Sequence, residues 1–365
     1  MDAALARLVD QVQTARAANG HFRIVGGGTK DFYGNALQGQ PIDVRPLAGI
    51  SSYEPTELVV SVRAGTPLAE LEALLGERGQ HLAFEPPRFG PGATVGGMVA
   101  AGLAGPARAA AGSVRDHLLG ATLLNGRGEV LTFGGQVMKN VAGYDISRVL
   151  AGSMGVLGII CEVSLKVLPA PTATATLRFE CDQADALRRL HAWGGEPLPI
   201  SASAWWDGLL ILRLAGARAA VEAATLQLGG EAIEGALAAT FWQGLRDQRD
   251  EFFVNAAKAI DAGAALWRLG VPQTAAALVL PGEQLVEWGG AQRWLCTPAP
   301  AAALREAAAA AGGHATLFRA NDHHADKSAG CFHPLSAPLA RFHRELKKAF
   351  DPDRVFNRGR LYAEL

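Results

Sequence analysis

The sequence predicts an α+β protein in which a glycine-rich domain comes first and a smaller domain with an antiparallel sheet follows. The chain has 365 residues, which is long for one hydrophobic core and fits two domains. Glycine clusters end before Pro169, and beyond it predicted strands and helices alternate. We therefore expect domains over 1–170 and 171–337, with a C-terminal helix and tail, 338–365, that return to the first domain.

The composition excludes several classes of protein. The chain is 49% hydrophobic and 19% charged, so it can bury a large core and is not disordered. Its formal net charge of -1 argues against binding to nucleic acid or to a membrane surface, because both need a basic patch. No Cys-x-x-Cys pair occurs, so a cysteine-only iron–sulfur or zinc site is not expected. The four cysteines are Cys161, Cys181, Cys296 and Cys331.

We expect a cytoplasmic protein with no transmembrane segment. The first residues lack the basic and apolar regions of a signal peptide. No apolar run reaches the roughly 20 residues that a membrane-spanning helix needs. Isolated cysteines also fit a reducing compartment.

The first domain begins with an amphipathic helix, because Leu5, Leu8, Val9 and Val12 share one face at helical spacing. Thr66-Pro67 predicts the start of a second helix that ends near Gly79. Strands are expected where apolar and β-branched residues run between turn residues: 21–25, 42–44, 58–62 and 158–167, with a hairpin over 117–133 that turns at 125–128.

The second domain alternates strands and helices and shows no internal sequence repeat. Strands are expected over 174–179 and 209–214, and helices over 184–193 and 299–311. We expect an antiparallel sheet with helices on one face. A final helix spans 338–350.

Two glycine clusters, Gly26–Gly28 and Gly90–Gly97, do not match the common nucleotide-binding motifs. The dinucleotide fingerprint G-x-G-x-x-G fails because Asp31 and Val95 stand where its third glycine belongs. The P-loop sequence G-x-x-x-x-G-K-[ST] does not occur. Rossmann-type binding and nucleotide hydrolysis are therefore both disfavoured.

The same clusters suggest two turns that hold a diphosphate from opposite sides. Successive backbone N–H groups in a glycine turn bind anions, and side chains would block the approach. Thr94 can cap the small-residue helix that follows it or donate its hydroxyl to a phosphate. The alternatives are a plain tight turn at Gly26–Gly28 and tight helix packing over Thr94–Leu103.

A series of motifs runs over nearly the whole chain: Gly26-Gly27-Gly28-Thr29, Ala93-Thr94-Val95-Gly96-Gly97-Met98, Gly112-Ser113-Val114-Arg115-Asp116, Lys139-Asn140-Val141-Ala142-Gly143-Tyr144-Asp145, Gly152-Ser153-Met154-Gly155-Val156-Leu157-Gly158, and Phe350-Asp351-Pro352 with Phe356-Asn357-Arg358-Gly359-Arg360-Leu361. In this order the motifs resemble the FAD domain of the vanillyl-alcohol-oxidase/PCMH-type flavoproteins. Within that family the chain is similar to the smaller FAD-binding subunits of bacterial glycolate oxidases.

The resemblance implies FAD and a set of residues that hold it. The residues implied for the pyrophosphate are Gly26, Gly27, Gly28, Thr29, Lys30, Gly92, Thr94, Gly96 and Gly97. Those implied along the ribityl and flavin region are Gly102, Ser113 and Arg115; those at the adenine end are Gly158, Ile159 and Ile160; and Asn357 is implied near the isoalloxazine ring. Many members attach FAD to a histidine in the first glycine loop. Because Thr29, Lys30 and Asp31 occupy that loop here, we expect non-covalent FAD.

The catalytic set of the family is incomplete in this chain. Catalytic relatives carry H-x-G-D-G-N-x-H near the C-terminus, whereas here only Gly330 and His333 remain, with Cys331 in place of asparagine. His333 is the candidate catalytic residue, and a buried structural histidine is the alternative. His323 and His324 offer metal ligands, but an adjacent pair on a polar loop is typical of solvated side chains, so no metal is predicted.

Basic residues near the C-terminus have two interpretations. On the last helix they mark either a solvated face or a docking surface: Arg341, Arg344, Lys347 and Lys348. Arg358 and Arg360 either bind a carboxylate or are ordinary surface charges.

Three functions follow from the resemblance. The first is an FAD-containing subunit of a glycolate (2-hydroxy acid) oxidase, with a larger FAD-binding catalytic subunit and an iron–sulfur subunit as partners. The second is a stand-alone FAD-dependent dehydrogenase for a D-2-hydroxy acid such as D-lactate. The third is a structural subunit that has lost its flavin.

Overall fold

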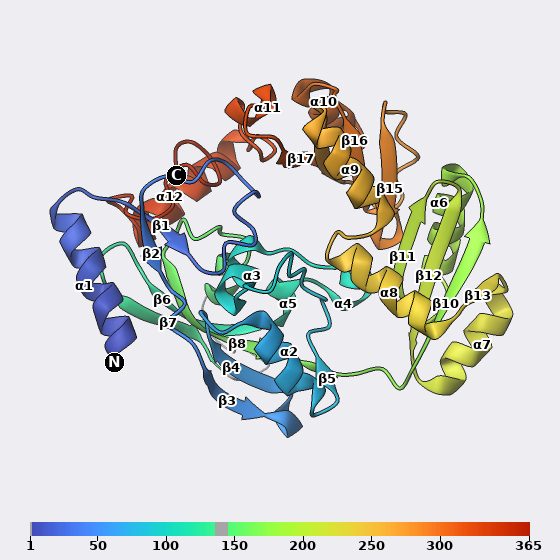
Figure 1. Ribbon diagram of the computed structural model, residues 1–365, viewed down its shortest axis with the longest axis horizontal. Helices are drawn as coiled ribbons and strands as arrows, with labels where there is room; N and C mark the ends of the chain where they lie inside the picture. Colours follow the sequence, from blue (N-terminus) through green and yellow to red (C-terminus); the bar gives the residue numbers. More distant parts are fainter. Residues whose placement is uncertain (1, 136–144) are drawn as a thin grey trace. The chain divides into compact units, whose positions relative to one another are not determined.

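The computed structural model describes residues 2–135 and 145–365, which divide into two units. The first unit consists of Met1–Leu103, Ser113–Pro169 and Pro334–Leu365, and the second of Ala104–Gly112 and Ala170–His333 (Figure 1). Most of the motif Lys139–Asp145 lies outside the described residues. Within the described ranges, no helix is both long and apolar enough to cross a membrane.

The first unit is built on a five-stranded antiparallel sheet in the order β3-β4-β8-β6-β7. Its strands are β3 (Ile50–Glu54), β4 (Val59–Arg63), β6 (Leu118–Leu124), β7 (Val130–Gly134) and β8 (Ile159–Lys166). The predicted hairpin is confirmed by the β6–β7 pairing. In its turn the side chain of Asn125 accepts hydrogen bonds from the backbone N–H groups of Arg127 and Glu129, which fixes the reversal.

A second layer of this unit joins the two ends of the chain. β1 (Phe22–Val25) and β2 (Gln40–Asp43) form a parallel pair, and α1 (Ala3–Ala17) packs beside them. The hydrophobic cluster here contains Leu8 and Val12 of the predicted amphipathic face, and also Phe356 from the tail. The predicted first helix is therefore confirmed, and its apolar face packs against residues from the far end of the sequence.

Among the residues that the structure describes, the remaining elements of the first unit are three helices of four to nine residues, the longer C-terminal helix α12, two 3₁₀ turns and a pair of two-residue strands. The predicted second helix is confirmed as α2, with Pro67 at its N-cap. The helices are α2 (Leu68–Gly76), α3 (Val95–Ala101), α5 (Val114–His117) and α12 (Ala337–Phe350), with 3₁₀ turns η1 (Pro55–Glu57) and η2 (Ser147–Leu150); β5 (Gln80–His81) pairs with β9 (Leu168–Pro169).

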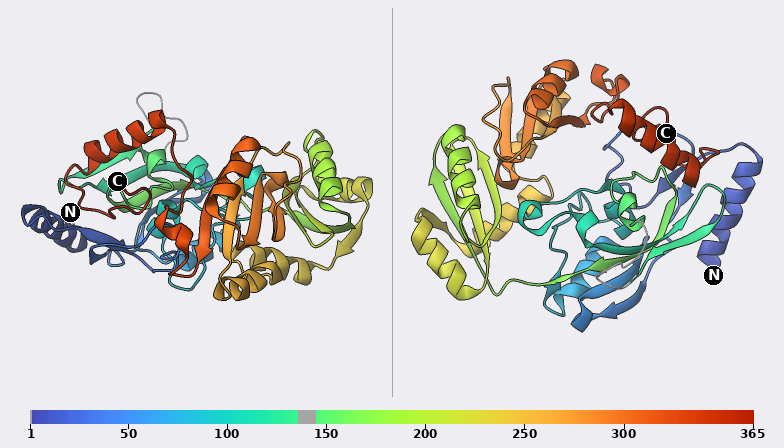
Figure 2. Two further views of the ribbon diagram at one scale, coloured as in Figure 1. Left: turned by 90° about the horizontal axis from the view of Figure 1, so that it is seen from above. Right: turned by 180° about the vertical axis from the view of Figure 1, so that it is seen from behind.

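The second unit is one eight-stranded antiparallel sheet in the order β13-β10-β12-β11-β15-β16-β14-β17, and its strands can be followed in Figure 2. The predicted antiparallel sheet is thus confirmed. The strands are β10 (Ala173–Glu180), β11 (Ile200–Trp206), β12 (Leu209–Gly216), β13 (Glu231–Ile233), β14 (Ala265–Gly270), β15 (Glu283–Glu287), β16 (Gln292–Thr297) and β17 (His314–Ala320). The helices are α4 (Arg108–Ala111), α6 (Gln183–Gly194), α7 (Arg218–Leu228), α8 (Gly235–Arg246), α9 (Glu251–Asp261), α10 (Ala301–Ala310) and α11 (Ala325–Ser328), with the 3₁₀ turn η3 (Trp288–Gly290).

This sheet consists of two halves with the same strand order. The run β10-α6-β11-β12-α7-β13 follows the β-α-β-β-α-β pattern of ferredoxin-like folds. Across the sheet its strands lie in the order β13, β10, β12, β11, which are the fourth, first, third and second strands of the run along the chain. The strands β14, β15, β16 and β17 repeat this order, with α10 in the place of α7. The halves meet where Ala204 pairs with Glu287 and Trp205 with Val286. The sequence shows no repeat because strand pairing needs matching apolar alternation and not identical side chains.

Helices cover both faces of this sheet, so the expectation of helices on one face is wrong. On one face, Leu212 packs with Val221 of α7. On the other, Trp242 of α8 donates its indole N–H to the hydroxyl of Thr176 at 3.0 Å. In the second half, Leu295 packs with α10 while its neighbour Trp294 stacks edge-on against Phe253 of α9. Successive strand residues point to opposite faces, so α6, α7 and α10 lie on one face, and α8 and α9 on the other.

A buried ion pair fixes the last helix to the tail within the first unit. Lys347 Nζ lies 2.8 Å from Asp351 Oδ2, and their side chains are 5% and 0% exposed, so the expectation that Lys347 belongs to the exposed face of this helix is wrong. The ammonium also donates to the carbonyl oxygens of Val156 at 2.7 Å and Phe356 at 2.9 Å. The Asp351 carboxylate accepts the backbone N–H groups of Val355 and Phe356. Burial lowers the pKa of Lys347, and the charge of Asp351 acts against this shift.

We predict that Asp351→Ala lowers the free energy of unfolding by about 3–5 kcal/mol, because it leaves the ammonium of Lys347 buried without its counter-charge. Urea denaturation followed by circular dichroism measures this. The control is Asp353→Ala, which removes a pair with Arg16 whose side chains are both 46% exposed. Its expected cost is below about 1 kcal/mol, and equal costs for the two variants would contradict the role given to Lys347.

Candidate functional site

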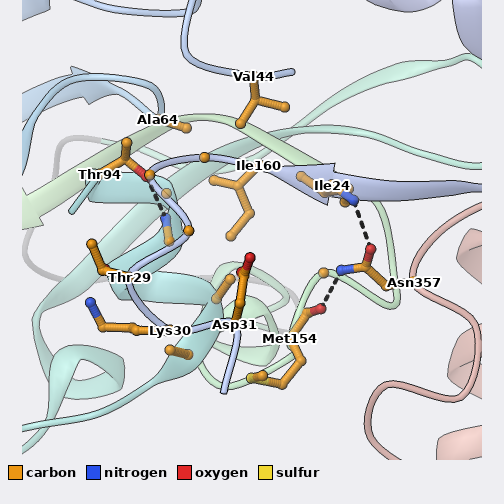
Figure 3. A pocket seen from close by; sticks show the side chains of 18 of the residues that line it. Ile24, Thr29, Lys30, Asp31, Val44, Ala64, Thr94, Met154, Ile160 and Asn357 are labelled. Atoms are coloured by element: carbon orange, nitrogen blue, oxygen red, sulfur yellow. Dashed lines mark hydrogen bonds between the residues drawn. The ribbon is translucent and has the colours of Figure 1, made fainter. Parts of the chain in front are cut away.

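The first unit contains a pocket whose walls come from six separate parts of the chain (Figure 3). They are the end of β1 with the loop that follows it, the residue after β2, the residue after β4, α3 with its N-cap, the turn before β8 with the start of that strand, and the tail. Counted together with the open solvent at its mouth, the pocket has about 790 Å³ of empty space. The predicted site residues that line it are Gly26, Gly27, Gly28, Thr29, Lys30, Thr94, Gly96, Gly97, Gly158, Ile160 and Asn357.

Five predicted site residues do not line this pocket: Gly92, Gly102, Ser113, Arg115 and Ile159. Gly102 ends α3 with φ +65° and lies against Gly152. Ser113 and Asp116 form a capping box at the start of α5, which also carries the exposed Arg115. The side chain of Ile159 is fully buried in the cluster that contains Phe356.

The two glycine clusters touch each other. A Cβ on Gly27 would lie 1.5 Å from the carbonyl oxygen of Gly92, and a Cβ on Gly26 would lie 2.7 Å from Thr94 Oγ1. Gly28 has φ +69°, which side chains disfavour. The first cluster therefore packs directly on the start of the second, and position 27 requires glycine for this backbone contact.

Thr94 begins α3, as predicted. Its backbone is extended and its Oγ1 accepts the N–H of Gly97 at 3.2 Å. Gly96 packs tightly on the end of β4, since a Cβ there would lie 2.6 Å from Cβ of Ala64. A Cβ on Gly97 would meet only Thr94 Oγ1 within 4 Å. Tight helix packing therefore accounts for Gly96. At Gly97 the missing side chain leaves open space in the pocket.

Asn357 connects two walls of the pocket. Its Oδ1 accepts the backbone N–H of Ile24 at 2.8 Å, and its Nδ2 donates to the carbonyl of Met154 at 2.7 Å (Figure 3). A Cβ on Gly155 would lie 2.7 Å from this Nδ2, which explains a glycine at that position. The amide thus holds β1 and the turn before β8 at a fixed separation.

Arg360 also lines the pocket, and it was not among the predicted site residues. It is only 4% exposed, so the interpretation as a surface charge is wrong. Its guanidinium donates to the backbone carbonyls of Lys30, Asp31 and Asn35. The sequence motif around Asn357 pointed to this tail but could not tell which arginine faces inward.

Several further lining residues were not among the predicted site residues. Met154 and Gly155 stand in the motif Gly152–Gly158, and Asp31 follows the first glycine cluster. The others are ordinary apolar or small residues that only their position in space makes part of the site: Ile24, Leu37, Val44, Ala64, Ala100 and Ala101.

His333 belongs to the second unit and is bound to backbone. Its Nδ1 accepts the N–H of Ala315 at 3.4 Å, and its ring lies 6.4 Å from that of His314. Burial lowers the pKa of both histidines, with Arg305 adding to the effect on His333, so both favour the neutral form at pH 7. This hydrogen bond supports the structural interpretation of His333.

The adjacent histidines do not form a metal site with their neighbours. His324 caps α11 by accepting the N–H of Asp326 at 3.3 Å, and His323 is exposed. Across residues 2–135 and 145–365, no three His, Cys, Asp or Glu side chains are grouped to hold a metal ion.

We predict that Gly27→Ala destabilises the first unit by about 1–3 kcal/mol or more, because its Cβ forces the two glycine clusters apart. Thermal unfolding measures the change. The matched control is Gly76→Ala at the end of α2, where nothing lies within 4 Å of an added Cβ. That control should be neutral or stabilising by up to about 1 kcal/mol, and a similar loss in both variants would show that the Gly27–Gly92 contact is not special.

Comparison with known proteins agrees with this architecture. Residues 4–134 match the family model of the FAD binding domain. The chain is 48% identical to the glycolate oxidase subunit GlcE of Escherichia coli, over 98% of this chain and 97% of that one. It is 30% identical to a mitochondrial D-lactate dehydrogenase [cytochrome] of Arabidopsis thaliana, over 42% of this chain and 27% of that one.

A solved structure extends the likeness in fold to nearly the whole chain. An alkyldihydroxyacetonephosphate synthase superimposes with a TM-score of 0.65 at 15% identity, covering 96% of this chain and 75% of that one. The predicted fold class, a PCMH-type FAD-binding domain followed by an antiparallel-sheet domain, is thereby confirmed. Near-complete coverage at 48% identity, together with the FAD-binding domain, shows that the chain belongs to the family of the glycolate oxidase subunit GlcE.

Proposed function

We propose that this chain is an FAD-binding subunit of a glycolate (2-hydroxy acid) oxidase, and that it passes electrons from hydroxy-acid oxidation to partner subunits. The observation that carries the proposal is the 48% identity with GlcE over nearly the full length of both chains. FAD supplies the acceptor for the hydride removed from the hydroxy acid.

The pocket residues fit a flavin dinucleotide. Gly97 has no side chain to fill the space beside it, so an extended ligand can approach the backbone there. Lys30 adds a positive charge that suits a diphosphate; its Nζ lies 5.5 Å from the centre of the Phe89 ring. Val44 and Ile160 add apolar surface for a ring. These residues would bind and orient the cofactor.

We propose that FAD is held without a covalent bond. Among the described residues that line the pocket, none is His, Cys or Tyr. Thr29 occupies the glycine loop where many family members carry the attachment histidine, and neither its hydroxyl nor the ammonium of Lys30 is a usual point of flavin attachment.

The electrons must leave through partners, which we propose are a larger FAD-binding catalytic subunit and an iron–sulfur subunit. The four cysteines of this chain are free, and three of them are buried. Burial raises the pKa of Cys161 to about 12, so its thiol stays protonated and is a poor ligand at neutral pH. We further propose a cytoplasmic complex, with contact to the inner face of the membrane only through the partners.

A second candidate is a stand-alone FAD-dependent D-2-hydroxy acid dehydrogenase. The similarity to a D-lactate dehydrogenase favours it, although that match covers 42% of this chain. This function needs a base on the chain itself, and His333 is the candidate from the family motif. Its hydrogen bond with the backbone of Ala315 counts against that role.

We predict that the isolated chain is yellow and oxidises glycolate and D-lactate poorly, whereas the complex purified from its host oxidises glycolate. An absorption spectrum, turnover assays and identification of co-purified proteins measure this. Acid precipitation should release the flavin into the supernatant as free FAD.

Each contrary outcome would overturn one part of this proposal. Robust turnover by the isolated chain, abolished by His333→Ala, would establish the stand-alone dehydrogenase. A colourless protein that takes up no added FAD would establish a structural subunit. Flavin that stays with the precipitated protein would contradict non-covalent binding.

We predict that Arg360→Ala weakens FAD binding about 10–100-fold, because its guanidinium no longer holds the carbonyls of the glycine loop. Titration of apoprotein with FAD measures the dissociation constant. The control, Arg358→Ala, removes a neighbouring arginine whose guanidinium, within the part of the chain that the structure describes, bonds to the backbone carbonyls of Asp353 and Arg354 in the tail. The control should bind FAD like the wild type, and equal loss in both variants would contradict the specific role of Arg360.

A further inference from the structure

Asp31 places a carboxylate in the pocket. Its backbone is fixed, since its N–H donates to the carbonyl of Gly28 at 3.2 Å and its carbonyl accepts from Arg360 Nη2 at 2.9 Å. From this fixed point the side chain is directed toward the middle of the space enclosed by the walls (Figure 3). The loop therefore fixes the backbone position from which this carboxylate extends.

Within the described residues, no hydrogen bond or ion pair engages this carboxylate. The neighbouring Lys30 extends elsewhere, with its Nζ 3.5 Å from the carbonyl of Arg88 and over the Phe89 ring. The guanidinium of Arg360 is directed at backbone carbonyls. Asp31 thus brings a negative charge into a site whose proposed ligand is itself a dianionic diphosphate.

This charge restricts what can lie beside Asp31. An ionised carboxylate only accepts hydrogen bonds, and it repels a phosphate at close range. FAD offers hydroxyl donors on its ribityl chain and ribose, and N–H donors on its two ring systems. Only these groups are compatible with a carboxylate at this position.

We propose that Asp31 accepts a hydrogen bond from a hydroxyl or N–H group of the bound dinucleotide and selects against ligands that place phosphate beside it. This inference rests on the proposed binding of FAD. Asp31 is then a specificity residue of the pocket, separate from the glycine wall and Lys30, which suit the diphosphate.

The test is equilibrium titration of apoprotein with FAD for the wild type, Asp31→Asn and Asp31→Ala. Hydrogen bonds to charged groups correspond to about one to two orders of magnitude in Kd. Because Asp31 is solvent-accessible, we expect about a tenfold loss for Asp31→Ala and a smaller loss for Asp31→Asn, which keeps an acceptor oxygen. The control, Asp10→Asn on the exposed side of α1, makes the same charge change away from the pocket.

Unchanged or tighter FAD binding in both Asp31 variants would overturn the proposal, since it would mean that the carboxylate is idle or opposes the ligand. If wild-type protein binds no FAD, the proposed function itself fails, which is a separate result. Competition by FMN and by ADP-ribose locates the donor. If the Asp31 variants bind FMN more weakly than the wild type but bind ADP-ribose equally well, the donor lies in the flavin half of FAD. If they bind only ADP-ribose more weakly, the donor lies in the adenosine half. A loss for FAD with neither fragment affected would overturn a direct contact.

Discussion

The first unit depends on the buried contact between Lys347 and Asp351. The pair is shielded from water, and each partner uses its remaining hydrogen-bonding capacity on backbone groups near Val156, Val355 and Phe356. A buried pair of this kind contributes specificity through its geometry more than net stability. It forces the chain to turn back after α12, so that Phe356 enters the core formed by α1 and β1.

The pocket is a consequence of that return. Once Phe356 pairs with Phe22, Asn357 follows directly and bonds to β1 on one side and to the turn before β8 on the other. Three residues later, Arg360 reaches the carbonyls of the glycine loop. The last part of the chain therefore holds together pocket walls that come from the first glycine loop, β1 and the turn before β8.

Glycine has two different roles in this site. At Gly27 it allows two backbone segments to touch, and at Gly97 it leaves space in the pocket. The first role is structural and holds whether or not a ligand is bound. The second is compatible with FAD because the ligand needs direct access to backbone N–H groups. Both roles produce the same residue type in the sequence, which is why the motif alone did not separate them.

The second unit shows how topology can repeat without repeated sequence. Its two halves share a strand order and join through a short pairing between β11 and β15. His314 and His333 lie in the second half, where burial favours their neutral form. His333 accepts the backbone N–H of Ala315, so its Nδ1 is engaged within this half of the sheet.

The sequence by itself determined the elements whose cause is local. The face of α1, the hairpin turn at Asn125, the cap at Thr94 and the family motifs all follow from neighbouring residues. The tertiary structure alone decided that Arg360 points inward, that Gly27 packs on Gly92, and that helices cover both faces of the second sheet. These depend on contacts between residues far apart in the chain, and a local pattern carries no information about which distant partner a side chain meets.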